Sequence, residues 1–235
     1  MSLRTGPGWG RSLTKGVPVI GEFIHPNLSY RRSLRKALSD LSPGSDGEEI
    51  VAAYEQKRTS PGSGIPKELP LQIRFLLRLA ARNVALFKVM TERGLSKDLI
   101  DSLLHAINRE LSGLLGSPLY RLSRIAGCDP SRRLRFIDSL LYRTLFVRPF
   151  ARTMGRQESG LSFVITYCPF AVFYAANGAA PACAAAACSL DAQLASEWNA
   201  DFERTSTIAA GAAGCDFLFR PRDRIAEEGN LTRAD

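Results

Sequence analysis

Apolar residues in the middle of the chain recur at intervals of three and four, which places them on one face of an α-helix. The strongest such stretch runs from Glu68 to Arg93 and stops at Gly94, a residue type common at helix ends. Ser96 and Asp129-Pro130 are typical beginnings of two further helices. The three predicted apolar faces are Ile73, Leu76, Leu77, Ala80, Val84 and Phe87; Ile100, Leu103, Leu104, Ile107, Leu111 and Leu114; and Leu134, Ile137, Leu140, Leu141 and Leu145. These helices predict a bundle.

Two shorter helices are expected before this bundle. Tyr30 to Leu41 is basic and amphipathic, and Glu48 to Lys57 follows a turn rich in Pro, Gly and Ser. The same residue types are concentrated again from Ser60 to Pro66, which indicates a linker. The first 25 residues are rich in Gly and Pro and show no sustained period, so we expect an arm there.

The pattern changes after Met154-Gly155. Leu161 to Tyr167 is short and rich in β-branched and aromatic residues, as a buried strand should be. Two helices and two strands are expected to follow it: Pro169 to Ala176, Pro181 to Trp198, Phe202 to Ile208 and Cys215 to Arg220. The glycines between the last two suit a loose hairpin. We therefore predict an α+β fold, with an N-terminal helical part packed against a small C-terminal antiparallel sheet with two short helices.

These patterns divide the 235 residues into four segments. We expect an N-terminal extension with short helices and a linker (1–66), a helical region (67–159), an α+β region that contains cysteines (160–220) and a polar tail (221–235). The formal net charge of +8 is uneven, since residues 1–159 carry 26 basic and 14 acidic side chains and residues 160–235 carry 5 and 9. The arginines are spread over several helices without interleaved aromatic residues, so we do not expect nucleic-acid binding.

The composition also limits the chemistry and the location. The two histidines, His25 and His105, exclude sites that need three imidazoles, so Cys, Asp, Glu or Tyr must supply a general base. The number of cysteines is odd and no signal-peptide pattern precedes them, which predicts free thiols in the cytoplasm. Their irregular spacing without a CxxC pair predicts no metal site, and no cofactor is expected. The uncharged stretch 159–190 is interrupted by polar residues and Pro169, so we expect no membrane span.

Two of the thiols are the best candidates for a nucleophile. Cys168 precedes Pro169 at the start of a predicted helix, where the helix dipole and free N–H groups would lower its pKa. Cys188 and Asp191 are three residues apart, hence on one face of the next helix, where the carboxylate could exchange a proton with a substrate. Cys183 lies five residues before Cys188, off that face, and is expected in the core.

Arg204 lies in the predicted strand from Phe202, on the same face as Phe202 and Ser206. An arginine that points inward beside thiols needs an anion, and the two oxygens of a substrate carboxylate match its guanidinium group. A salt bridge to Asp216 or Glu197 at the rim is the alternative.

The order of these motifs resembles that of the L-2-amino-thiazoline-4-carboxylic acid hydrolase family. Four segments carry the resemblance: Thr166 to Phe170 (TYCPF), Cys188 to Asp191 (CSLD), Phe202 to Thr207 (FERTST) and Gly214 to Phe219 (GCDFLF). It is confined mainly to residues 160–220. The alanines at 184–187 and Leu218 depart from the family pattern and make the pocket more apolar.

The resemblance implies an enzyme that opens a cyclic amidine or related small heterocycle bearing a carboxylate by hydrolysis. It places Cys168, Cys188, Asp191, Arg204, Cys215 and Asp216 in or near the pocket. A thiolate of Cys188 or Cys168 would attack the electrophilic carbon, Asp191 would protonate the leaving nitrogen and Arg204 would hold the carboxylate. The reverse reaction, formation of such a ring, is equally compatible, and a metal-activated water is a less favoured variant. A second hypothesis is a non-catalytic ligand-binding protein or partner subunit of a biosynthetic enzyme, with a protein partner or a second copy on its arginine-rich helices.

Overall fold

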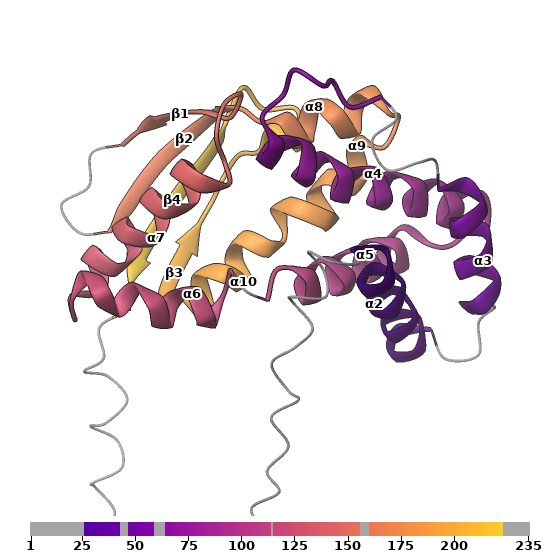
Figure 1. Cartoon of the computed structure of the whole chain (residues 1–235), viewed down its shortest axis with the longest axis horizontal. Coiled ribbons are helices and arrows are strands. Elements are labelled where there is room, and N and C mark those ends of the chain that lie inside the picture. The colour runs from indigo at the N-terminus through magenta and orange to yellow at the C-terminus, as the bar shows by residue number, and fades with distance from the viewer. Residues whose placement is uncertain (1–25, 43–46, 59–63, 114, 156–159, 223–235) are drawn as a thin grey trace, which may run out of the picture.

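The computed structural model describes residues 26–42, 47–58, 64–113, 115–155 and 160–222. The predicted arm (1–25), part of the predicted linker and most of the predicted tail lie outside these ranges. The N-terminal part is helical (Figure 1). Its helices are α2 (Pro26–Leu41), α3 (Gly47–Lys57), α4 (Leu71–Glu92), α5 (Lys97–Leu111), α6 (Ser117–Leu122) and α7 (Pro130–Thr144), with a 3₁₀ turn at Ser123–Ala126.

The predicted helix starts are confirmed by their hydrogen bonds. The Ser96 hydroxyl accepts a bond from the Leu99 N–H at 3.3 Å and begins α5. The Asp129 carboxylate accepts bonds from the N–H groups of Ser131 and Arg132 and begins α7. Each cap satisfies donors that the first turn of a helix leaves without a partner.

The C-terminal part contains a four-stranded antiparallel sheet with the strand order β1-β2-β4-β3. Its elements are β1 (Ala151–Met154), β2 (Leu161–Tyr167), α8 (Pro169–Ala176), α9 (Ala180–Cys183), a π-helical turn (Ala184–Cys188), α10 (Leu190–Glu197), β3 (Ala200–Glu203), a 3₁₀ turn (Ile208–Ala210) and β4 (Cys215–Pro221). The predicted α+β class is confirmed.

Three details differ from the prediction. Residues 151–154, predicted to lie in the helical region, form the edge strand β1 against β2. The predicted strand Phe202 to Ile208 begins at Ala200 and ends at Glu203, which leaves Arg204 in a loop. The predicted helix Pro181 to Trp198 is divided, because its alanine-rich middle adopts a π-helical turn.

The sheet buries one face, and alternate residues of β2 and β4 supply it. Phe163 and Phe217 are register partners whose rings stack at 4.8 Å, and Phe219 packs beside them. This face packs with α6, α7 and α10 into one apolar core. The period of two therefore determines which residues of the C-terminal part face the helices.

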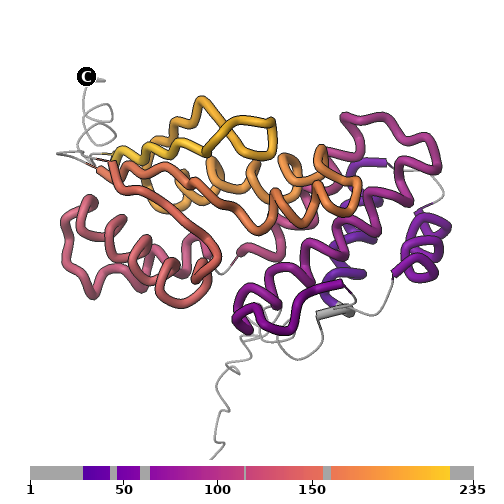
Figure 2. The backbone as a smooth tube through the Cα atoms, turned by 90° about the horizontal axis from the view of Figure 1, so that it is seen from above, coloured from indigo at the N-terminus to yellow at the C-terminus, as the bar shows by residue number. Residues whose placement is uncertain are grey.

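A second core fills the helical part and extends into the C-terminal segment. Helices α2, α3, α4 and α5 bury residues together with α8, α9 and the π turn. Seen from above, the segment α8 to α10 (orange) lies between the sheet and helices α2 to α5 (Figure 2). This segment borders both cores, and it carries Cys168, Cys183, Cys188 and Asp191.

Candidate functional site

A cavity of about 320 Å³ lies between the two cores, lined by residues of α4, α5, α7, α8, α10, β2 and β4. Five of the six site residues named from the sequence line it: Cys168, Cys188, Asp191, Arg204 and Cys215. Asp216 is not part of its lining. The fold therefore brings together residues from α8, the π turn, α10, the loop after β3 and β4, which are up to 47 positions apart (215 − 168).

The π turn brings a further thiol to Cys188. The Ser189 N–H reaches back five residues to the Ala184 carbonyl at 2.9 Å, so one turn contains an extra residue. As a result the side chains of Cys183 and Cys188 form a hydrogen bond. The prediction that Cys183 lies in the core is confirmed, but the prediction that it lies away from Cys188 is wrong.

This pair has opposite pKa shifts. The hydrogen bond from Cys183, helped by the positive charge of Arg204, holds the pKa of Cys188 below its usual value, although burial and the negative charge of Asp191 oppose this. The pKa of Cys183 is raised, because it would have to give up the proton that it donates to Cys188 and because it is desolvated. These directions favour the thiolate form at Cys188 over Cys183.

Cys168 immediately precedes α8, as predicted, but its electrostatics differ from the prediction. Burial raises the pKa of its thiol to about 11, although the backbone N–H groups of Ala171 and Phe170 act to lower it. The expectation of an acidic Cys168 is wrong, because desolvation of the thiolate outweighs the helix N-terminus.

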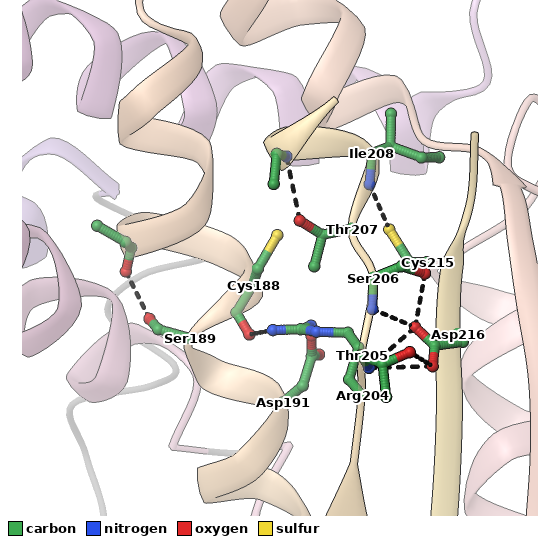
Figure 3. A network of polar contacts seen from close by, with 12 residues as sticks. Cys188, Ser189, Asp191, Arg204, Thr205, Ser206, Thr207, Ile208, Cys215 and Asp216 are labelled. Carbon is green, nitrogen blue, oxygen red and sulfur yellow. Dashed lines mark hydrogen bonds and ion pairs between the residues drawn. The ribbon is translucent and has the colours of Figure 1, made fainter. Parts of the chain in front are cut away.

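Asp191 and Arg204 form a salt bridge across the cavity wall, with Nη1 and Oδ2 separated by 2.5 Å (Figure 3). Arg204 also donates from Nη2 to the Cys188 carbonyl at 3.0 Å, which ties the loop after β3 to the π turn. The partner is thus neither Asp216 nor Glu197, the two rim partners considered from the sequence. Burial raises the pKa of Asp191 to about 6, although Arg204 opposes the shift.

Asp216 and Cys215 hold the loop that carries Arg204. The Asp216 carboxylate accepts hydrogen bonds from the backbone N–H and hydroxyl groups of both Thr205 and Ser206, which holds its pKa well below the usual range (Figure 3). The Cys215 sulfur accepts a bond from the Ile208 N–H at 3.1 Å, and burial raises the pKa of this thiol. These contacts explain why the chain leaves the sheet at Arg204.

Sequence reasoning missed two polar side chains of α7 that line the cavity, Asp138 and Tyr142. Asp138 pairs with Arg152, whose guanidinium carbon lies 3.4 Å from the centre of the Tyr142 ring. Burial raises the pKa of Tyr142, and the carboxylates of Asp138 and Asp191 add to this shift, although Arg152 opposes it. The signal was present, because Asp138 and Tyr142 are four residues apart beside the apolar face of α7.

His105 also contacts this region from the far side of the π turn. Its Nδ1 lies 2.7 Å from the hydroxyl of Ser189, which in turn donates to the Ala185 carbonyl at 2.6 Å. Burial lowers the pKa of His105, so this imidazole is neutral near pH 7. It supports the π turn and does not line the cavity.

All five cysteines are free. Within the ranges that the structure describes, no group of three or more His, Cys, Asp or Glu side chains is arranged to hold a metal ion. Among the described helices, none has the length and apolar character needed to cross a membrane.

Comparison with known proteins gives one clear result. The family model of L-2-amino-thiazoline-4-carboxylic acid hydrolase matches residues 84–219, while no curated protein matches. Among solved structures, the Fe(II) unliganded H-NOX protein from K. algicida is 13% identical over 83% of this chain and 96% of that chain, with a TM-score of 0.36. Its alanine-to-glycine mutant is 12% identical over 84% and 97%, also at 0.36. These scores are too low to indicate a shared fold.

The family match reaches further toward the N-terminus than the four motifs do. It begins within α4, includes α5, α6 and α7, and ends in β4, so it covers most of the residues that line the cavity and more than half of the chain. The chain therefore belongs to the L-2-amino-thiazoline-4-carboxylic acid hydrolase family.

Proposed function

We propose that the protein is a cysteine-dependent hydrolase that opens a small nitrogen-containing ring bearing a carboxylate, with Cys188 as the nucleophile. The observation that carries this proposal is the π turn, which gives Cys188 a hydrogen-bond donor in Cys183 while Asp191 and Arg204 lie beside it. Family membership supports a hydrolase in general. The choice of Cys188 rests on its pKa, which is lowered, whereas the pKa values of Cys168, Cys183 and Cys215 are raised.

Asp191 is suited to act as the acid. With a pKa of about 6 it is protonated in a useful fraction of molecules near neutral pH, unlike an exposed carboxyl group. Catalytic acids work best when their pKa lies close to the working pH. A substrate carboxylate that binds Arg204 would compete for the positive charge that now stabilises ionised Asp191, and would therefore favour its protonated form.

The proposed reaction has two steps. The Cys188 thiolate forms a bond to the ring carbon between the heteroatoms, and Asp191 protonates the ring atom that leaves as its bond to this carbon breaks. Water then attacks the same carbon, Asp191 takes back the proton that the water loses, the carbon–sulfur bond breaks and the thiolate of Cys188 is restored. One water molecule is consumed, and no oxidant or reductant is required.

Arg204 is proposed to bind the substrate carboxylate and to position Asp191. A guanidinium group has five N–H donors, and the bonds to Asp191 and to the Cys188 carbonyl leave donors for a bound anion. Asp216 acts through Arg204, because it fixes the loop on which Arg204 lies.

The test uses L-2-amino-thiazoline-4-carboxylate as the probe and follows loss of the ring by NMR. Cys188→Ser should abolish ring opening and leave binding measured by calorimetry unchanged, because serine is nearly isosteric with cysteine but its hydroxyl is far less ionised. Cys128→Ser is the matched control, since Cys128 is exposed and does not line the cavity.

Retained turnover in Cys188→Ser would contradict the role of Cys188 and would make Cys168 the candidate nucleophile. Binding without turnover by the unaltered protein would support the alternative, a non-catalytic ligand-binding member of the family.

A further inference from the structure

Most of the cavity lining is apolar, and this feature is not explained by a compact polar substrate. The thiols, Asp191 and Arg204 form one part of the wall, while residues of α4, α7, α8 and the sheet supply aromatic and aliphatic side chains. A five-membered ring with an amino group and a carboxylate has little apolar surface to place against them. Polar groups that enter an apolar cavity lose hydrogen bonds to water, which costs free energy.

Four rings form a continuous aromatic wall beside the polar group. Tyr142 contacts Phe146 at 5.5 Å between ring centres, Phe146 contacts Phe150 at 5.2 Å, and Phe150 contacts Phe170 at 5.8 Å. All four line the cavity. The wall lines the same cavity as Asp191 and Cys168, and Phe170 follows Cys168 by two residues.

Helix α4 adds Phe75, Leu76 and Leu79 to the lining, and Phe75 packs in the same apolar cluster as Phe146, Phe150 and Phe170. The volume of about 320 Å³ lies in the range, about 300 to 1,000 Å³, of pockets that enclose drug-sized ligands. The space is thus large enough for a ring together with a hydrophobic substituent.

From this arrangement we infer that the substrate is a heterocyclic carboxylate that carries a hydrophobic group of about phenyl size, held against the aromatic wall while the heterocycle meets Cys188. The inference rests on the proposed function for the position of the reacting ring. The aromatic wall would bind the substituent edge-to-face, a geometry that aromatic rings prefer. Burial of its surface would supply affinity that the compact ring lacks.

The test compares two probes, for binding on Cys188→Ser and for turnover on the unaltered protein: 2-amino-thiazoline-4-carboxylate and the same compound with a benzyl group on ring carbon 5. Calorimetry on Cys188→Ser gives the two dissociation constants, and loss of the ring gives the two values of kcat/KM. We expect the benzyl compound to bind about 10- to 100-fold more tightly, as burial of a phenyl-sized apolar group predicts. Its kcat/KM should rise in proportion if the substituent binds equally in the transition state.

A pair of variants on α4 locates the effect. Phe75→Ala removes a ring from the cavity and should reduce the preference for the benzyl compound, whereas Phe87→Ala, at a half-buried position of the same helix outside the cavity, should not. Affinity for the compact probe should be similar in both.

The two proposals fail separately. Equal or weaker binding of the benzyl compound, or binding of neither probe, would overturn the inference whatever the outcome for turnover. Tight binding of the benzyl compound without opening of either ring would support the hydrophobic subsite and overturn the hydrolase. Turnover of the compact probe, with no turnover of the benzyl compound, would support the hydrolase and overturn the hydrophobic subsite.

Discussion

Two buried polar networks border the same cavity, and they differ in charge. In the helical part, Asn83 of α4 accepts a hydrogen bond from the Tyr30 hydroxyl and exchanges bonds with Asn108, and its amide also donates to the Tyr174 hydroxyl. In the C-terminal part, Cys183, Cys188, Asp191 and Arg204 form the second network. Burial raises the pKa values of Tyr30 and Tyr174, so the first network is neutral near pH 7, whereas the second contains a salt bridge and groups whose pKa values are shifted in opposite directions.

The difference indicates what each network does. Neutral amides and hydroxyls satisfy one another at any pH near 7, so the Asn83 network joins α2, α4, α5 and α8 without a proton to exchange. In the Cys188 network, burial raises the pKa of Asp191, and the hydrogen bond from Cys183 lowers the pKa of Cys188. Opposite shifts of this kind are a feature of sites that transfer protons.

The largest effect is expected for the acid of the charged network. Asp191→Asn keeps an oxygen for Arg204 but removes the proton, so kcat for ring opening should fall by roughly 100- to 10,000-fold, the range for a positioned acid. In the unaltered protein kcat should decrease as the pH rises through about 6, because Asp191 must be protonated to act. In Asp191→Asn this decrease should disappear. An identical pH profile in both proteins would remove Asp191 from the mechanism.

A substitution in the neutral network should instead affect stability. Asn83→Leu leaves the Tyr30 hydroxyl and the Asn108 amide without their buried partner, which we expect to cost about 3 kcal/mol in the free energy of unfolding. Denaturation by urea measures this loss. The pKa of Cys188, followed by alkylation of the folded protein, should not change. A change in the pKa of Cys188 would show that the neutral network and the charged network are coupled.

Sequence patterns predicted the parts of the fold that depend on periodicity. The apolar spacing of α4, α5 and α7 and the composition of β2 were sufficient, because burial of one face determines these elements. β1 was missed since its four residues, Ala151–Met154, form an edge strand that is mostly exposed and therefore has no apolar period. β3 ends early because Asp216 binds the backbone of Thr205 and Ser206, which lie eleven and ten residues before it in the sequence.

The sequence indicated which residues lie near the cavity better than it indicated their ion-pair partners and pKa values. Motif order was enough to name five residues that line one cavity, but the partner of Arg204 depends on how the loop folds, and the pKa of Cys168 depends on how deeply it is buried. The alanines at 184–187 gave no sign of the π turn, because alanine is compatible with either helical pitch. Contact between Cys183 and Cys188 follows only from that turn.

This contact gives the smallest and most specific prediction. Cys183→Ala removes the donor to Cys188, so alkylation of Cys188 by iodoacetamide at pH 7 should slow by about tenfold, as expected for loss of a hydrogen bond to a charged group. Cys183→Ser should restore much of the rate, because a serine hydroxyl also donates, and Cys128→Ser should have no effect. Mass spectrometry of the labelled peptides separates Cys188 from the other thiols. An unchanged rate in Cys183→Ala would mean that the pKa of Cys188 is lowered without Cys183, by Arg204 and the local backbone. The contact made by the π turn would then have no part in activating the nucleophile.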